Sequence, residues 1–161
     1  MKKALKFLGI IAIAALVGFS FVSCDLDNPK ADATALAINT WSAEGDLPDS
    51  KAEKWFSFDV TSGTTYYFWA KDTWTLDLIA SGDDEDYAWL SLDLEYEDGT
   101  SIFEDKAPNS NTAASTSSTA AYFEASQTGK VYMRVYADTF WKKYGKYRIA
   151  FTSTTTRPAG H

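Results

Sequence analysis

Apolar and polar side chains alternate along five short segments, and this alternation constrains the fold more than any other feature. In residues 90–96 every second side chain is apolar, and Ser91, Asp93 and Glu95 lie between them. The same period of two recurs in residues 55–60, 76–80, 131–137 and 147–151. A helix cannot place such a pattern on one side, whereas a strand does so directly. The pattern therefore predicts strands with one buried face.

Turn signals separate these segments. Asp98-Gly99 is typical of the centre of a hairpin, and Gly63 and Gly129 each precede another alternating run. We find no convincing helical pattern after the N-terminal segment. About eight short strands, each with a polar face, indicate an all-β fold, an antiparallel β-sandwich or barrel.

Two polar stretches stand apart from the alternating segments, one within the domain and one after it. Residues 108–119 consist almost wholly of Ser, Thr, Ala and Asn, and we expect a mobile loop there. Residues 154–161 are expected to form a polar C-terminal tail. The predicted sandwich domain thus covers residues 34–153.

The chain begins with an export signal. Lys2, Lys3 and Lys6 precede an uncharged, mainly apolar run over residues 7–23. The sequence Phe21-Val22-Ser23-Cys24 resembles a lipobox, which implies removal of residues 1–23 and a diacylglyceryl thioether on Cys24. The alternative is an uncleaved anchor, because 17 residues reach the short end of the roughly 17–25 that span a bilayer. Both interpretations place the domain outside the cytoplasm, behind a polar tether over residues 24–33.

Charge narrows the possible partners. Cleavage would remove three lysines, so 15 basic residues become 12 against 22 acidic ones, a net charge of about −10. Nucleic acid and anionic lipid head groups both require a basic surface, so neither is an expected partner. Membrane attachment would come from acyl chains on Cys24. Lipidation of this only cysteine would also leave no thiol for a disulfide.

Several segments resemble a domain of treponemal (spirochaete) lipoproteins, which is itself similar to the bacterial pre-peptidase C-terminal domain. The resemblance rests on residues 36–41, 53–58, 62–68, 92–99, 129–135 and 144–151. It implies a jelly-roll-like β-sandwich in the envelope of a bacterium, on the periplasmic side or at the outer surface. Some members bind calcium through paired aspartates, and this chain has only Asp93 near that position.

Catalytic groups are scarce. The only histidine is His161 at the chain end, where it cannot serve a nucleophilic triad or a histidine zinc site. The acidic run containing Asp83, Asp84 and Asp86 is typical of a solvated loop, and calcium binding is the alternative. Neighbouring carboxylates on one loop do not provide the separated pair of a glycosidase. We therefore expect a protein without enzymatic activity and without a resident cofactor.

Aromatic residues are the remaining functional signal, at 16% of the chain with six tryptophans. Some rings, such as Phe58 and Phe151, fall in phase with the predicted core, while others, such as Trp55 and Tyr132, fall on the opposite face. Exposed rings stack on sugars or anchor protein partners. We select Trp69, Trp74, Trp89 and Trp141 as candidate ligand-binding residues for a glycan or an exported protein. The alternative is a structural lipoprotein whose aromatic rings are covered and which acts through protein contacts alone.

Overall fold

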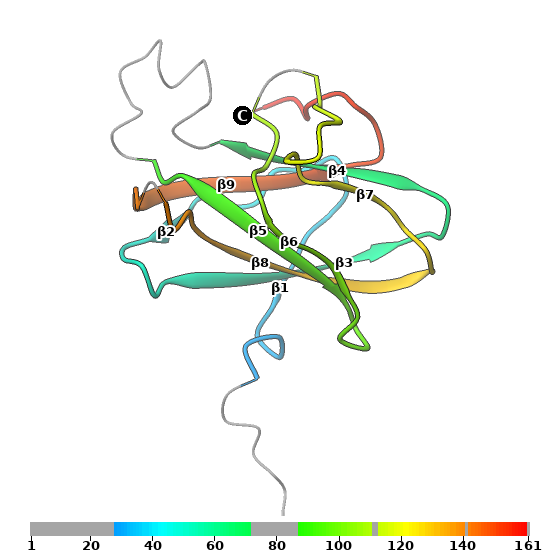
Figure 1. Ribbon diagram of the computed structural model, residues 1–161, viewed down its shortest axis with the longest axis horizontal. Coiled ribbons are helices and arrows are strands. Elements are labelled where there is room, and N and C mark those ends of the chain that lie inside the picture. The colour runs from blue at the N-terminus through cyan, green and yellow to red at the C-terminus, as the bar shows by residue number, and fades with distance from the viewer. Residues whose placement is uncertain (1–27, 72–86, 111–112, 141, 161) are drawn as a thin grey trace, which may run out of the picture.

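The computed structural model describes residues 28–71, 87–110, 113–140 and 142–160, and these residues form nine strands in two layers (Figure 1). One sheet has five strands in the order β1 (Thr34–Ala35), β3 (Glu53–Val60), β8 (Gly129–Ala137), β5 (Leu90–Tyr96) and β6 (Ser101–Lys106). The other has four in the order β2 (Gly45–Leu47), β9 (Gly145–Thr152), β4 (Thr65–Lys71) and β7 (Tyr122–Glu124).

The predicted all-β sandwich is confirmed, with one exception to its antiparallel pairing. Strands β3 and β5 both pair antiparallel with the central strand β8, whereas β1 pairs parallel with β3. No helix occurs in the described ranges, and accordingly none there is long and apolar enough to cross a membrane. The predicted strand at residues 76–80 lies outside the described residues.

The core fills the space between the two sheets. It is rich in aromatic rings: Phe58 lies 4.3 Å from Phe151 between ring centroids, and Phe68 stacks with Phe123 at 6.1 Å. The apolar phase of β5 is wholly inside, since Leu92 and Leu94 are at most 1% exposed. These residues are the ones that the alternating pattern assigns to the buried face.

The outer face of the four-stranded sheet carries a second, smaller core. Trp69 of β4 is fully buried, and its indole nitrogen donates to Thr152 Oγ1 at 2.8 Å. Trp41 covers it together with Ala150, and the Trp41 indole donates to the carbonyl of Pro158 at 3.2 Å. The prediction that Trp69 lies exposed is therefore wrong. Alternation placed its ring opposite to the main core, but segments distant in sequence cover that side as well.

Two of the covering segments are the ones for which the sequence predicts a mobile loop and a polar tail. The backbone of Thr156, in the expected tail, forms a β-bridge with Ala113, and the Arg157 guanidinium lies 5.3 Å from the Trp41 ring centroid. In the expected mobile loop, buried Asn109 donates to the carbonyls of Phe68 and Ala121. A polar segment can thus be fixed by hydrogen bonds to a sheet edge without burying much apolar surface of its own.

Candidate functional site

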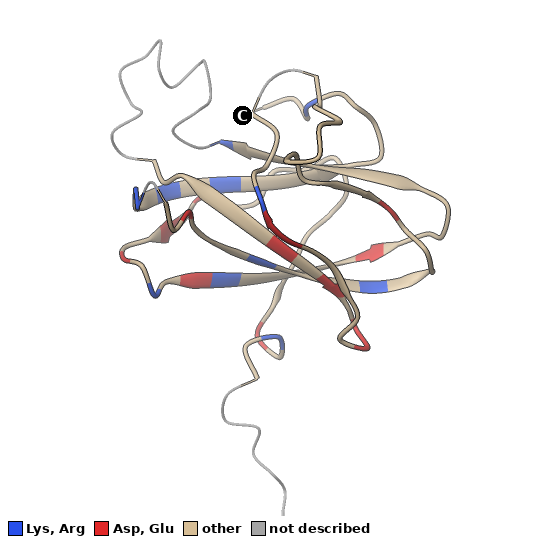
Figure 2. Cartoon of the chain, in the orientation of Figure 1, with Lys and Arg blue, Asp and Glu red and all other residues tan. Residues whose placement is uncertain are grey.

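Aromatic and charged side chains gather on the outer face of the five-stranded sheet. We call this group the five-strand face; it comprises Glu53, Trp55, Asp93, Glu95, Tyr132, Arg134 and Tyr136. All of them are half-buried except Glu53, which is exposed. Charged residues of both signs follow the strands of this sheet (Figure 2). The face combines rings that can stack with groups that can form hydrogen bonds.

The register of the sheet brings the polar members of the face together. Arg134 of β8 lies directly between Trp55 of β3 and Asp93 of β5. Its guanidinium donates twice to Asp93 Oδ2, from Nε at 2.9 Å and also from Nη2, and once to Glu53 Oε2 at 3.3 Å. The guanidinium also lies 4.6 Å from the Tyr136 ring centroid. An arginine that donates twice to one carboxylate oxygen and stacks on a ring has a well-defined geometry.

The same contacts shift two pKa values. Burial acts to lower the pKa of Arg134, but the hydrogen bond and the charge of Asp93 outweigh it, and the pKa is raised. Burial raises the pKa of Tyr136, and the charge of Asp93, which accepts a hydrogen bond from the tyrosine hydroxyl at 3.1 Å, raises it further. Arg134 therefore stays charged and Tyr136 stays neutral through the physiological pH range.

Beside this network lies an aromatic patch with a shallow cavity of about 170 Å³. Trp55 lines the cavity, and its indole donates to Glu53 Oε1 at 2.9 Å. Lys30, from the segment that leads into β1, places its Nζ 5.8 Å from the ring centroids of both Trp55 and Tyr132. The same ammonium forms an ion pair with Glu95.

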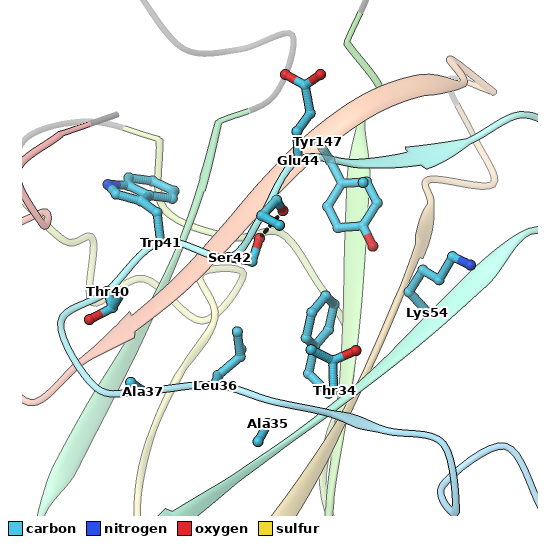
Figure 3. A pocket seen from close by; sticks show the side chains of 13 residues that line it. Thr34, Ala35, Leu36, Ala37, Thr40, Trp41, Ser42, Glu44, Lys54 and Tyr147 are labelled. Carbon is cyan, nitrogen blue, oxygen red and sulfur yellow. Dashed lines mark hydrogen bonds between the residues drawn. The ribbon is translucent and has the colours of Figure 1, made fainter.

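A second concavity, the edge pocket, opens where the segment between β1 and β2 passes from one sheet to the other (Figure 3). Its volume is about 450 Å³, within the range of roughly 300–1,000 Å³ typical of small-molecule sites. Besides that segment, Lys54, Phe56 and Tyr147 line it. The Tyr147 ring points from β9 toward the side formed by Thr34 and Lys54.

Tyr147 is held in the edge pocket by a glycine. Gly45 of β2 pairs directly with Tyr147 of β9, and a Cβ added at Gly45 would lie 2.5 Å from the tyrosine ring. The ring therefore packs over the glycine backbone, as aromatic residues do opposite glycines at sheet edges. Burial raises the pKa of Tyr147 to about 12, with a further contribution from the charge of Asp46. The hydroxyl is thus neutral at physiological pH and can donate or accept a hydrogen bond.

The predicted site residues do not form one cluster. Trp69 is buried, as described above, while Trp89 is half-buried just before β5. Near it on the loop after β8, Phe140 is 79% exposed. A backbone hydrogen bond joins the two segments: Asp138 N, two residues before Phe140, donates to Trp89 O at 2.7 Å. The other candidates lie outside the described residues: Cys24, Trp74, Asp83, Asp84, Asp86 and Trp141.

Sequence reasoning missed several members of these sites. Trp55, Tyr132 and Tyr136 carried a signal, because each lies out of phase with the core residues of its strand. No sequence signal indicated the contact of Lys30 with the five-strand face, because that contact joins positions far apart in sequence. Within the described ranges, no group of three or more His, Cys, Asp or Glu side chains is arranged to hold a metal ion.

No known family profile matches the sequence, and no curated protein matches it either. Among solved structures, the chain is similar to the pre-peptidase C-terminal domain of a collagenase from Bacillus anthracis, with 17% identity and a TM-score of 0.47. That match covers 74% of this chain and 94% of the other. It is also similar to PliG, a periplasmic inhibitor of g-type lysozyme from Salmonella Typhimurium, with 11% identity and a TM-score of 0.48. There the coverage is 74% and 96%.

Proposed function

We propose that the protein is a lipid-anchored binding module of a bacterial cell envelope, without catalytic activity, and that it binds a glycan or an exported protein through the five-strand face. One observation carries this proposal. Trp55, Tyr132 and Tyr136 stay partly exposed on the five-strand face, whereas the protein's own segments cover Trp69 on the opposite side of the sandwich. Partly exposed tyrosine and tryptophan rings on one face present an apolar body and a polar end to a ligand or partner.

The chemistry of the face suits recognition. Tyrosine and tryptophan bring large contact areas and few rotatable bonds, and arginine accompanies them in the central parts of many interfaces. Asp93 and Glu53 hold Arg134 in place, so little conformational freedom would be lost when a ligand binds. Sugar rings stack on such aromatic faces, and protein side chains pack between them.

The anchor in this proposal is Cys24, as the sequence indicates. Ten residues over 24–33 would join it to β1, which is long enough for at most about 35 Å of extended chain. The domain would thus stay close to the membrane that holds its acyl chains. Trp74, Trp89 and Trp141 remain candidates for additional contacts.

A binding screen with matched variants tests the proposal. We expect full-length protein in mild detergent to bind an envelope polysaccharide on a glycan array or, failing that, to crosslink to an exported protein in intact cells. Trp55→Ala or Tyr132→Ala should weaken that binding at least about tenfold, because truncating an aromatic anchor at an interface costs more than 1–2 kcal/mol. Tyr122→Ala is the control, because Tyr122 is a half-buried tyrosine on the other sheet.

Unchanged binding by both five-strand-face variants would contradict the proposal. Loss of binding in Tyr122→Ala alone would place the contact on the other sheet. If neither a glycan nor a protein is captured in a Trp55-dependent way, the protein would act as a structural lipoprotein instead.

A further inference from the structure

Three strands of the five-stranded sheet each contribute one group to a site that holds a primary ammonium ion. Trp55 comes from β3, Tyr132 from β8 and Glu95 from β5. The ammonium is that of Lys30, 5.8 Å from both ring centroids and paired with the Glu95 carboxylate. We call these three residues the ammonium cage. Two aromatic rings within about 6 Å of a cation and one carboxylate are the chemistry by which proteins recognise ammonium groups.

The sheet builds the cage independently of the lysine that occupies it. Glu95 and Tyr132 are direct partners in the β5–β8 register, and Trp55 is fixed on β3 by its hydrogen bond to Glu53. Lys30, in contrast, belongs to a short turn outside both sheets. That turn is held by local bonds, from Lys30 N to Asn28 Oδ1 at 3.1 Å and from Ala33 N to Lys30 O at 3.2 Å. Withdrawal of the lysine would therefore leave the cage intact.

The charges around the cage favour a cation over any other ligand. Besides Glu95, the carboxylates of Asp93 and Glu104 line the adjoining cavity, and Arg134 is the cation that lines it. Asp93 already neutralises Arg134. If Lys30 left, the carboxylate of Glu95 would lose its ion-pair partner. An anionic or neutral ligand would not restore that balance.

We propose that the ammonium cage binds a lysine side chain of a protein partner, in competition with Lys30. This inference rests on the proposed function. Of its two ligand classes it selects an exported protein, and it requires that protein to carry an exposed lysine. Lys30 acts as a tethered competitor: its ammonium occupies the cage while no partner is present and leaves when the partner's lysine enters. A competitor on a short tether has an effective concentration in the millimolar range or above, so it raises the dissociation constant of a free ligand.

Titration with a lysine peptide tests the cage. The probe is a short peptide with one central lysine and blocked ends, and its control has norleucine at that position. Full-length protein in detergent micelles is titrated, and the dissociation constant is measured by isothermal titration calorimetry, which also applies to a variant that lacks Trp55. We expect Lys30→Ala to bind the lysine peptide about tenfold more tightly than the original protein, because the tethered competitor is gone. Lys130→Ala, which removes an exposed lysine from β8 outside the cage, should bind as the original does.

The cage proposal would be overturned if Lys30→Ala and the original protein bound the lysine peptide with equal affinity. It would also be overturned if the norleucine peptide bound as tightly as the lysine peptide. Unchanged binding after Trp55→Ala is added to Lys30→Ala would overturn it as well. Circular dichroism confirms that each variant is folded. The proposed function fails separately: it fails if no envelope ligand is captured in a Trp55-dependent way, whatever the lysine peptide does. Trp55-dependent capture of a ligand with no response to Lys30→Ala would leave the proposed function in place and reject the cage.

Discussion

Replacing Trp69 with alanine will lower the free energy of unfolding by about 3–5 kcal/mol, the usual cost of truncating a buried tryptophan. The indole is fully buried in a cluster with Trp41 and Ala150, so its removal leaves a cavity. The substitution also strips the Thr152 hydroxyl of its 2.8 Å donor. A loss of this size is a large part of the roughly 5–15 kcal/mol that stabilises a typical domain.

Chemical denaturation followed by far-ultraviolet circular dichroism measures this loss. Two variants serve as controls. Trp69→Phe keeps most of the ring and loses the hydrogen bond, so it should cost about 1–3 kcal/mol. Trp55→Ala makes the same truncation on the partly exposed five-strand face and should cost less than about 1.5 kcal/mol. If Trp69→Ala were as stable as Trp55→Ala, the outer face of the four-stranded sheet would not be covered.

Alkaline pH will destabilise the protein through Tyr147. The ordinary pKa of tyrosine is 10.0, and burial raises the pKa of Tyr147 in the folded state to about 12. The folded state therefore favours the neutral phenol. That preference stabilises the fold fully below pH 10 and is lost as the pH rises through 12. At about 1.4 kcal/mol per pKa unit, the total loss is roughly 3 kcal/mol.

The comparison of the original protein with Tyr147→Phe isolates this effect. Between pH 10 and 12 the free energy of unfolding of the original protein should fall by about 2 kcal/mol more than that of the variant, which is most of the total loss. Tyr136, whose pKa burial also raises, is present in both proteins, so its contribution cancels. Identical pH dependence of the two proteins would show that Tyr147 ionises without resistance in the folded state.

Much of the sandwich could be predicted from the alternation of side chains, since the period of a strand is a local property. Residues 90–96 form β5 and residues 131–137 lie within β8, both with their apolar phase inside. The turn at Asp98-Gly99 could also be predicted from the sequence. In the structure Gly99 has a φ of 85°, and Thr100 N donates to Asp98 Oδ1 at 2.9 Å. Such turn geometry favours glycine for steric reasons that hold in any protein.

The covering of the outer faces could not be predicted in the same way. Alternation separates the two sides of a strand, but it does not say whether another segment lies over the second side. Trp41 and Pro158 are joined by a hydrogen bond across 117 positions, and that contact decides the exposure of the face to which Trp69 belongs. The prediction for Trp69 failed for this reason. The alternation also placed Trp55 and Tyr132 on the outer face. There the prediction agrees with the structure, since both residues stay partly exposed.

The arrangement within the candidate site also depended on register. The pairing of Arg134 with Asp93 follows from their positions opposite one another on β8 and β5, which the pattern of a single strand does not contain. The contact of Lys30 with Trp55 and Tyr132 depends on the path of the chain before β1. Aromatic residues of the right kind could thus be recognised from the sequence, but their neighbours could not.

Hydroxyl-radical footprinting in the native envelope tests most directly whether the five-strand face is the binding surface. Oxidation of Trp55, Tyr132 and Tyr136 would be compared between intact cells and the purified full-length protein. Phe140, 79% exposed on its loop, reports the radical dose in both samples. We predict that the three residues of the five-strand face are protected several-fold in cells relative to Phe140, because a partner covers them. Equal oxidation in both samples would show that the face is bare in the envelope and would contradict the proposed function.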